Sequence, residues 1–194
     1  MKPLSICVYC GSRLGERPEY EAGARELGRL IAEQGWQLVY GGGNVGLMGI
    51  LADAALAGGA RVVGVIPESL MKREVGHRAL SELHVVQTMH QRKQMMAERA
   101  DAFLALPGGI GTFEELFEAW TWRQLGYHDK PLGLLNVAGY YDGFVQFMRH
   151  TTEQGFLSAA QLQTLEIDSD ARQLLQRLAS LAPKARAADD YTRI

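Results

Sequence analysis

Short apolar segments alternate along this chain with longer segments in which apolar residues recur at helical spacing. A continuous apolar run is typical of a buried strand, whereas the longer spacing is typical of a helix with one buried face. The runs predict strands at residues 4–9, 37–40, 62–66, 83–86, 102–106, 132–136 and 165–167. The helical spacing predicts helices at residues 18–35, 46–58, 89–99, 116–125, 140–153 and 170–181.

Strands that alternate with helices of this length indicate βαβ units, which build a parallel sheet through right-handed crossovers. The predicted fold class is therefore α/β, a Rossmann-like doubly wound parallel sheet in a single domain over residues 1–182. Residues 183–194 form a polar C-terminal tail, which we expect to be frayed. Ligands of such sheets bind at the carboxyl ends of the strands, so the loops there are candidate sites.

The composition is that of an ordinary soluble globular protein. The 194 residues are 47% hydrophobic and 22% charged, and the formal net charge is -2. A chain that is not basic is a poor match for a nucleic acid polymer. The apolar run before Gly11 is too short for a signal peptide, and no run approaches the roughly 18 residues of a membrane span. We therefore expect neither polymer nor membrane as a partner.

Cys7 and Cys10 are the two cysteines of the sequence. A redox pair of this spacing opens a helix after its strand, whereas Cys7 falls inside the first predicted strand. We interpret both as reduced structural thiols, with a redox pair as the alternative, and expect a cytoplasmic protein. The five histidines are scattered and form no close-spaced ligand pair, so we expect no metal site.

A glycine-rich loop follows the fifth predicted strand. Residues 107–115 read Pro-Gly-Gly-Ile-Gly-Thr-Phe-Glu-Glu and lead into a predicted helix. Gly108, Gly109 and Gly111 let a backbone come close to a ligand without a Cβ in the way. The unpaired N–H groups and partial positive charge at the start of the helix favour an anion, in particular a phosphate.

Thr112 and Glu115 in this loop have two interpretations. Thr112 can add a hydroxyl to a phosphate site, and Glu115, one helical turn in, can reach the sugar of a bound nucleotide. The same spacing is that of a capping box, in which the two side chains bond each other's backbone amides and only begin a helix. The three glycines favour the binding site, because a cap does not require them.

A second glycine-rich loop follows the strand predicted at residues 37–40. Gly41, Gly43 and Gly46 match G-x-G-x-x-G, and Glu68 lies where a dinucleotide fold would place its ribose-binding acid. The match alone is weak, and the glycines can equally serve a tight strand-to-helix turn. We favour an intermediate interpretation, in which both loops line one pocket and the ligand is a mononucleotide held by its 5′-phosphate.

Two cations lie on the helix predicted at residues 89–99. Arg92 and Lys93 share a face with Met89 and Met96 at helical spacing. Such cations can form only a solvated face. However, the helix ends immediately before the strand that leads to the phosphate loop, so we expect both cations to line the same cleft.

Residues 113–125 are hydrophobic on more than one helical face. Phe117, Trp120, Trp122 and Leu125 contribute to these faces. A helix that is apolar nearly all round must bury its second face, which indicates a subunit interface. The alternative is a helix buried in the core of its own domain.

Six motifs run in order between about residues 5 and 157. They are Val-Tyr-Cys-Gly-Ser at 8–12, Leu-Val-Tyr-Gly-Gly-Gly at 38–43, Val-Gly-Leu-Met-Gly at 45–49, Gly-Val-Ile-Pro at 64–67, Met-His-x-Arg-Lys at 89–93 and Pro-Gly-Gly-x-Gly-Thr-x-x-Glu at 107–115. Together they resemble the LONELY GUY family of cytokinin-activating phosphoribohydrolases. The resemblance implies a Rossmann-like homodimer without a cofactor. It also implies hydrolysis of the N-glycosidic bond of N6-modified adenosine 5′-monophosphate to free base and ribose 5-phosphate.

By the same resemblance, Arg92 and Glu115 form the catalytic pair. The residues expected to bind the substrate are Ser12, Gly43, Glu74, Arg92, Lys93, Gly108, Gly109, Ile110, Gly111, Thr112 and Glu115. Cleavage builds oxocarbenium character on the ribose, so a carboxylate beside the sugar can hold its hydroxyls or activate water. Arg92 can grip phosphate or stabilise negative charge, but a guanidinium does not give up its proton. The group that protonates the base is not evident, although His90 and Asp101 are nearby in sequence.

Two other functions fit the same motifs. One is a nucleosidase for purine and pyrimidine 5′-monophosphates that tolerates many bases. The other is a carrier that binds a nucleotide or a phosphorylated pterin cofactor without chemistry. A lysine decarboxylase label also accompanies this family, but we find no lysine in the context of a pyridoxal site.

Overall fold

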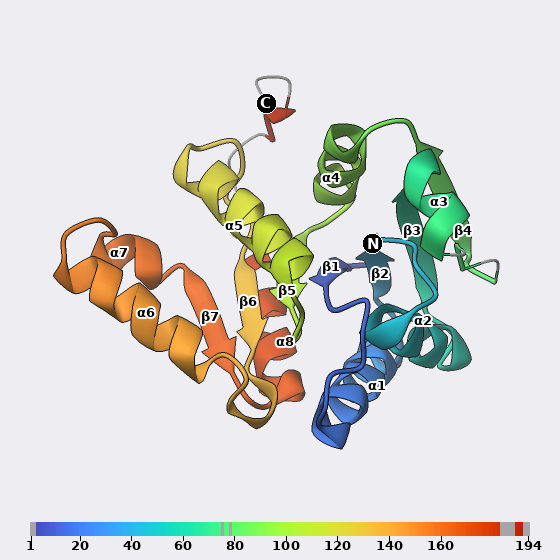
Figure 1. Ribbon diagram of the computed structural model, residues 1–194, viewed down its shortest axis with the longest axis horizontal. Coiled ribbons are helices and arrows are strands. Elements are labelled where there is room, and N and C mark those ends of the chain that lie inside the picture. The colour runs from blue at the N-terminus through green and yellow to red at the C-terminus, as the bar shows by residue number, and fades with distance from the viewer. Residues whose placement is uncertain (1–2, 75, 78, 183–188, 192–194) are drawn as a thin grey trace.

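The computed structural model describes residues 3–74, 76–77, 79–182 and 189–191, and it forms one seven-stranded sheet (Figure 1). The strands are β1 (Ser5–Tyr9), β2 (Gln37–Tyr40), β3 (Arg61–Pro67), β4 (Glu82–Val86), β5 (Ala102–Ala105), β6 (Leu132–Leu135) and β7 (Leu165–Asp168). The helices are α1 (Pro18–Glu33), α2 (Gly46–Ala57), α3 (Glu68–Glu74), α4 (Met89–Glu98), α5 (Ile110–Gln124), α6 (Asp142–Glu153), α7 (Ala159–Leu162) and α8 (Ala171–Leu181), with a short 3-10 turn, η1 (Val137–Gly139).

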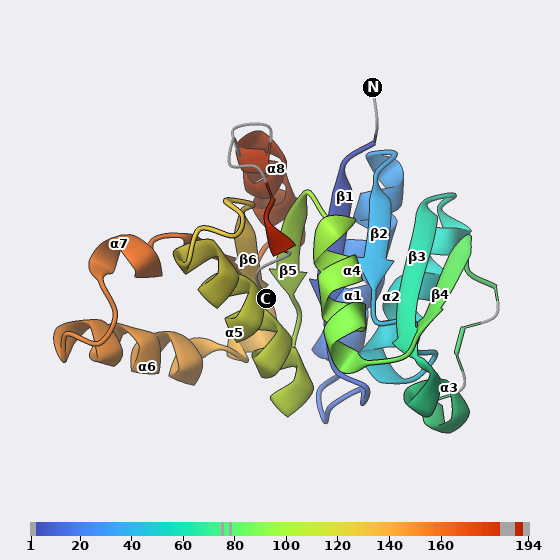
Figure 2. The same cartoon turned by 90° about the horizontal axis from the view of Figure 1, so that it is seen from above.

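Every strand of the sheet is parallel to its neighbours, in the order β4-β3-β2-β1-β5-β6-β7. The order reverses between β1 and β5, which is the arrangement of a doubly wound Rossmann-like sheet. Helices cover both faces, as Figure 2 shows from above. The predicted fold class and single domain are confirmed.

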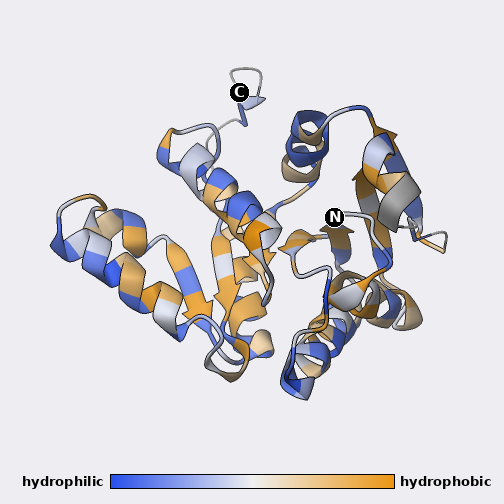
Figure 3. Cartoon of the chain, in the orientation of Figure 1, coloured by the Kyte–Doolittle hydropathy of each residue, from blue (hydrophilic) through white to orange (hydrophobic). Residues whose placement is uncertain are grey.

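Alternation along β1 divides the core between the two faces of the sheet. Ile6 and Val8 join a cluster with α1, α2 and α8, whereas Cys7 and Tyr9 join a second cluster with α4, α5 and α6. Both clusters take their residues from strands buried on two faces, which is why the strands are continuously apolar in sequence. Figure 3 shows the result, with hydrophobic strands inside and mixed colours on the helices.

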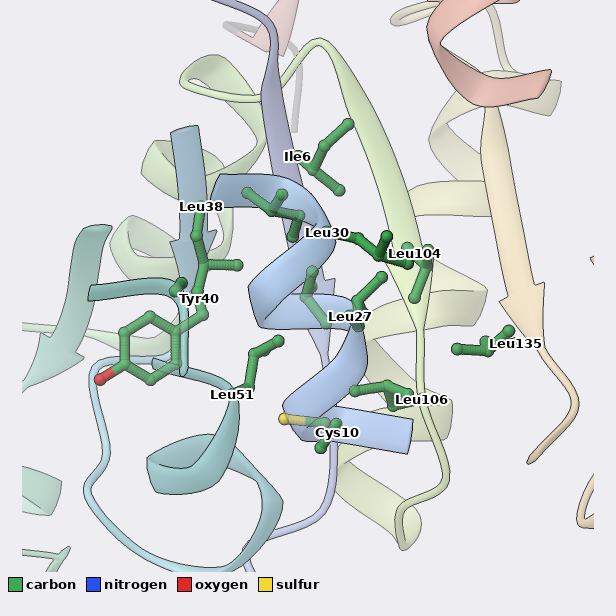
Figure 4. Packing of buried hydrophobic residues seen from close by; sticks show 14 of the residues in the cluster. Ile6, Cys10, Leu27, Leu30, Leu38, Tyr40, Leu51, Leu104, Leu106 and Leu135 are labelled. Carbon is green, nitrogen blue, oxygen red and sulfur yellow. The ribbon is translucent and has the colours of Figure 1, made fainter. Parts of the chain in front are cut away.

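Helix α1 supplies much of the first cluster. It begins at Pro18, as predicted, and Gly35 follows its end with a left-handed φ of 66°. Leu27 and Leu30 on its inner face lie against the sheet residues Ile6 and Leu104 in Figure 4. The helical spacing of these leucines therefore predicted the correct buried face.

Helix α5 belongs mainly to the second cluster. Trp120 and Trp122 are buried within the chain, so the core interpretation is correct for both tryptophans. Phe117 remains 40% exposed and Leu125 58% exposed. The buried tryptophans of this helix thus belong to the core of the chain. The exposed Phe117 and Leu125 are the candidates for contact with a second subunit.

Two short helices were not predicted from the hydrophobic spacing. Helix α3 lies in the polar segment after β3, and α7 has a single turn. Neither is long enough to show several repeats of an apolar face. A local signal for α7 is present, because Ser158 and Gln161 form a capping box at its start.

Cys7 and Cys10 are both free and buried. Burial raises the pKa of each thiol far above its usual range, with Glu115 adding to the effect. Thiols held in this state are poor nucleophiles, which supports the structural interpretation over a redox pair. Separately, none of the described helices is long and apolar enough to cross a membrane.

The predicted tail folds back at the residues that the structure describes. Tyr191 is buried, and its ring lies over the Lys130 ammonium at 5.3 Å. Lys130 Nζ also forms an ion pair with Asp189 at 2.6 Å and donates to the Ala97 carbonyl at 2.9 Å. The expectation of a frayed tail is therefore wrong for residues 189–191, because a buried ammonium requires partners. The rest of the tail lies outside the described residues.

We expect Tyr191→Ala to lower the free energy of unfolding by about 3 kcal/mol, the usual loss for a buried aromatic side chain. The substitution uncovers Trp122, whose ring lies 5.7 Å from that of Tyr191, and removes a partner of Lys130. Denaturant unfolding measures the change. Phe156→Ala is the control, because Phe156 is 89% exposed and its loss should cost less than about 0.5 kcal/mol. Equal losses in the two variants would contradict the described packing.

A second prediction concerns acid stability and His128. Its Nε2 lies 3.0 Å from the Ala119 carbonyl, and its Nδ1 accepts the N–H of Lys130, so the neutral ring is the bonded form. Burial first, and then the Lys130 cation, lower the pKa of His128 to about 4. The unfolded state protonates His128 as the pH falls below about 6.5, whereas the folded state does so only near pH 4. His128 should therefore lower the free energy of unfolding by about 3 kcal/mol as the pH falls from 6.5 to 4.

Unfolding curves at a series of pH values measure this effect. The variant His128→Gln should lose that part of the pH dependence, although its stability at pH 7 is lower. An unchanged slope in the variant would mean that other groups cause the acid sensitivity.

Candidate active site

A cavity of about 300 Å³ opens at the carboxyl ends of β1 and β5, where the strand order reverses. This is the position at which Rossmann-like sheets bind their ligands. A neighbouring cavity of about 540 Å³ shares four of its lining residues, namely Gly11, Ser12, Gly109 and Ile110. Residues of the loop after β1 and of the loop after β5 therefore line both cavities.

Backbone contacts hold these loops together. The Gly11 N–H donates to the Pro107 carbonyl at 3.0 Å, and the Gly11 carbonyl accepts the Leu47 N–H at 3.0 Å. Gly46 has a φ of 58°, and a Cβ there would lie 2.3 Å from the carbonyl carbon of Ser12. Gly46 thus serves the close approach of α2 to the loop after β1, which is a structural role.

The start of α5 tests the capping-box interpretation of Thr112 and Glu115. The N-cap residue is Gly109, and no side-chain bond caps the helix. The capping-box interpretation is wrong, since the N-cap is Gly109 and Thr112 lies inside the first turn, while the Glu115 carboxylate pairs with Arg92. The amides of the first turn have no carbonyl partner within the helix, so they are suited to an anion.

The glycines of this loop differ in whether the surrounding chain has room for a side chain. A Cβ on Gly108 would lie 2.1 Å from the Thr112 hydroxyl oxygen, so packing requires a glycine there. At Gly109 and Gly111, in contrast, φ is not left-handed and nothing lies within 4 Å of an added Cβ. The fold of the chain does not require these two glycines, which indicates that they leave space for a ligand.

Arg92 and Glu115 both line the smaller cavity, where their side chains form an ion pair. Arg92 Nη1 lies 3.1 Å from Glu115 Oε1, and both side chains are about 10% exposed. Arg92 Nε donates to the Val65 carbonyl at 3.2 Å. A Cβ on Gly41 would lie 2.0 Å from Arg92 Nη2, so only glycine at this position leaves room for the guanidinium. The second glycine loop therefore contributes to the site through Gly41.

Burial raises the pKa of Glu115, and the Arg92 guanidinium opposes this shift without cancelling it. A carboxyl group with a raised pKa takes up a proton more readily near neutral pH than an exposed one. Such a group is suited to general base catalysis. A perturbed carboxyl in a cleft beside a specific charge partner is also typical of functional sites.

Lys93 does not line the cavity, contrary to our expectation. Its ammonium forms ion pairs with Glu114 at 2.6 Å and with Glu118 at 2.8 Å. Burial alone would lower the pKa of Lys93, but the hydrogen bonds to these two carboxylates raise it. Adjacent helical residues point about 100° apart, which explains why Arg92 and Lys93 reach different partners. Lys93 therefore joins α4 to α5.

The remaining predicted site residues lie in different places. Ser12 and Ile110 line both cavities, and Ile110 is 87% exposed. Gly43 lines neither cavity, and its backbone forms a bridge to Gly76. Glu74 is the last residue of α3, and its side chain lies outside the described part of the structure.

Neither candidate for the proton donor to the base lies at the cavity. His90 is exposed on α4 and is not among the lining residues. Asp101 accepts the N–H of Ser5 at 2.8 Å, which places it at the amino end of β1, opposite the cavity.

Met48 and Leu70 form an apolar wall of the cavity, which was not predicted from the sequence.

Solved structures with the same fold include molybdenum cofactor proteins. The Moco Carrier Protein from Chlamydomonas reinhardtii superposes with a TM-score of 0.69 and 22% identity, over 95% of this chain and 99% of that chain. The molybdenum cofactor binding protein of Rippkaea orientalis gives a TM-score of 0.68 and 22% identity, over 93% and 98%. At this identity the likeness concerns the fold alone.

The sequence comparisons are more specific. Residues 48–178 match a family model described as "Possible lysine decarboxylase". The chain is 46% identical over 179 residues to the cytokinin riboside 5'-monophosphate phosphoribohydrolase LOG1 of Arabidopsis thaliana, covering 92% of this chain and 84% of that protein. It is 49% identical to the LOG enzyme of Oryza sativa subsp. japonica, over 92% and 74%. The chain therefore belongs to the LONELY GUY family of cytokinin riboside 5'-monophosphate phosphoribohydrolases.

Proposed function

We propose that this chain hydrolyses the N-glycosidic bond of N6-modified adenosine 5′-monophosphate, releasing the free base and ribose 5-phosphate. The observation that carries the proposal is the buried Arg92–Glu115 pair, which lies in the same cavity as the open glycine amides of α5. Relatives that are 46–49% identical bear the name of this activity. Among the described residues that line the cavity there is no lysine, and Lys93 is held by two carboxylates outside it.

We place the substrate by its charge. The 5′-phosphate lies against the amides of residues 110–112, where the helix dipole favours an anion. The ribose then lies towards Glu115, which is one turn further along α5. The base packs against the apolar side chains of Met48, Leu70 and Met89, which line the same cavity.

The chemistry follows from this placement. The bond between C1′ and the glycosidic nitrogen breaks, and its electron pair goes to the base. Glu115, as a carboxylate, stabilises the cationic sugar and accepts a proton from the water that adds to C1′. The departing base gains a proton from solvent, Glu115 returns to solvent the proton that it took from water, and ribose 5-phosphate remains. Arg92 keeps the Glu115 carboxylate in place and favours its ionised form.

Several finer points remain proposals. Homodimer formation fits the exposed Phe117 and the 58% exposed Phe147, and a cytoplasmic location fits the two free thiols. A nucleosidase of broad base specificity would use the same residues, and differs only in the apolar wall. A carrier would bind the ligand without cleaving it.

We expect Glu115→Gln and Arg92→Ala each to lower kcat/KM for base release by at least about a hundredfold, the usual size of a positioned acid–base effect. Glu98→Gln is the control, because it removes an exposed carboxylate from α4. Chromatography of the free base, with AMP and N6-isopentenyl AMP as substrates, gives the rates. Full activity of Glu115→Gln would exclude Glu115 from the mechanism.

The same assay separates the alternatives. Release of base from GMP and pyrimidine nucleotides at comparable rates would favour the broad nucleosidase. Tight binding of a nucleotide by the wild-type chain without any base release would favour the carrier, and the hydrolase proposal would then be wrong.

Gly111→Ala should weaken nucleotide binding while it leaves the fold intact or slightly more stable. Alanine is favoured over glycine in a helix by up to about 1 kcal/mol, and the added methyl group meets nothing within 4 Å in the free chain. We expect KM for AMP to rise at least about tenfold, because the methyl group occupies space needed by the phosphate.

The matched control is Gly143→Ala, the second residue of α6 as Gly111 is of α5, also with open space around an added Cβ. It should match the stability effect without changing KM. Thermal unfolding and steady-state kinetics of both variants decide. An unchanged KM in Gly111→Ala would place the phosphate elsewhere.

A further inference from the structure

The connection between β6 and α6 contributes two adjacent tyrosines to the glycine loop after β5. The Tyr140 hydroxyl donates to the Gly108 carbonyl at 2.5 Å, and the Tyr141 hydroxyl donates to the Leu106 carbonyl at 2.6 Å. The carbonyl between them, that of Pro107, accepts the Gly11 N–H. Three consecutive carbonyls before α5 are therefore each bound by a donor from a distant part of the chain.

These bonds hold the peptide groups of the loop in place. The peptide between Leu106 and Pro107 has no N–H, so the Tyr141 bond fixes the backbone there, whereas the Tyr140 bond also orients a donor. In a trans peptide the N–H points opposite to the carbonyl, and the described residues contain no cis peptide bond. Holding the Gly108 carbonyl on Tyr140 therefore directs the Gly109 N–H away from the tyrosine. The peptide between Gly108 and Gly109 has no side chain on either flank, so its rotation meets little steric resistance without such a bond.

The tyrosines are themselves held in place. Asn136 accepts the Tyr141 N–H through Oδ1 at 2.7 Å, and the ring of Tyr20 meets that of Tyr140 edge-on at 5.5 Å. Ala138, in the same connection, has a left-handed φ of 52°, which is unfavourable for a residue with a Cβ. Unfavourable backbone of this kind is retained where the surroundings impose it, and it gathers at functional sites.

We propose that Tyr140 and Tyr141 are positioning residues that fix the peptide orientation of residues 106–109, so that the amides at the start of α5 are preorganised for a monophosphate. This inference rests on the proposed function. The tyrosines act through the loop rather than on the reacting atoms. Their loss should weaken the grip on phosphate and leave the chemical step at C1′ nearly unchanged.

The test measures binding of ribose 5-phosphate and of adenine by isothermal titration calorimetry. One lost hydrogen bond of this type corresponds to about a three- to tenfold change in affinity. We therefore expect Tyr140→Phe to weaken ribose 5-phosphate binding about fivefold and the double variant with Tyr141→Phe at least about tenfold. Adenine, which lacks a phosphate, should bind as it does to the wild type. With AMP as substrate, KM should rise by the same factor while kcat stays within about twofold.

Tyr40→Phe is the matched control. The Tyr40 hydroxyl is buried and has no hydrogen-bond partner among the described residues, so its removal tests the loss of a phenol alone. It should leave both affinities unchanged. If Tyr141→Phe fails to fold, Tyr140→Phe decides alone, because Tyr140 is 37% exposed and tolerates the change.

The outcomes separate this inference from the proposed function. Unchanged ribose 5-phosphate affinity in Tyr140→Phe, or equal losses for ribose 5-phosphate and adenine, would overturn the positioning role. Absence of ribose 5-phosphate binding to the wild type would overturn it as well. Normal ribose 5-phosphate binding without base release from any nucleotide would refute the hydrolase and leave the tyrosine effect measurable.

Discussion

The reversal of strand order between β1 and β5 is the constraint on which the rest of the structure depends. Because crossovers are right-handed, the chain leaves β1 towards the face of α1 and leaves β5 towards the face of α5. The two crossover connections therefore diverge to opposite faces of the sheet, and cavities open at the carboxyl ends of the two strands, beside their hydrogen-bonded loops. The cavities, the glycine loop and the first turn of α5 all take their positions from this divergence.

The site concentrates interactions that a stable core would avoid. Burying the charges of Arg92 and Glu115 costs solvation that their mutual attraction only partly offsets. Ala138 holds an unfavourable φ, and Ile110 exposes an apolar side chain at the rim. Each of these features alone could occur in a protein without a binding site. Their occurrence together near the loop after β5 is typical of a ligand-binding surface that lowers the stability of the fold.

Sequence reasoning worked where the signal is local. Periodicity predicted the strands and long helices, and the glycine loop after β5 leads directly into a helix, as expected. That this helix start binds an anion stays a prediction. It failed for Lys93, because spacing alone did not show that carboxylates on another helix would bind it. The contact of Tyr140 with Gly108 spans 32 positions. Such contacts depend on which loops the sheet brings together, and the hydrophobic pattern does not encode that pairing.

The packing of Tyr191 against Lys130 was equally invisible, since a polar tail gives no periodic signal. The same limit applies to the chemistry. The motif marked Glu115 as a candidate, but its raised pKa depends on burial that arises only when the chain has folded.

The central pairing of β1 with β5 has a consequence for how the chain reaches its native state. The bond between the Ser5 N–H and Asp101 joins residues 96 positions apart, and the ladder beside it is equally non-local. Closing so long a loop lowers the entropy of the chain before the stabilising contacts have formed, so topologies of this kind fold slowly. The cavity at the carboxyl ends of β1 and β5 cannot exist in any intermediate in which β5 has not joined β1. A ligand of this cavity would therefore bind during refolding only after β5 has joined β1.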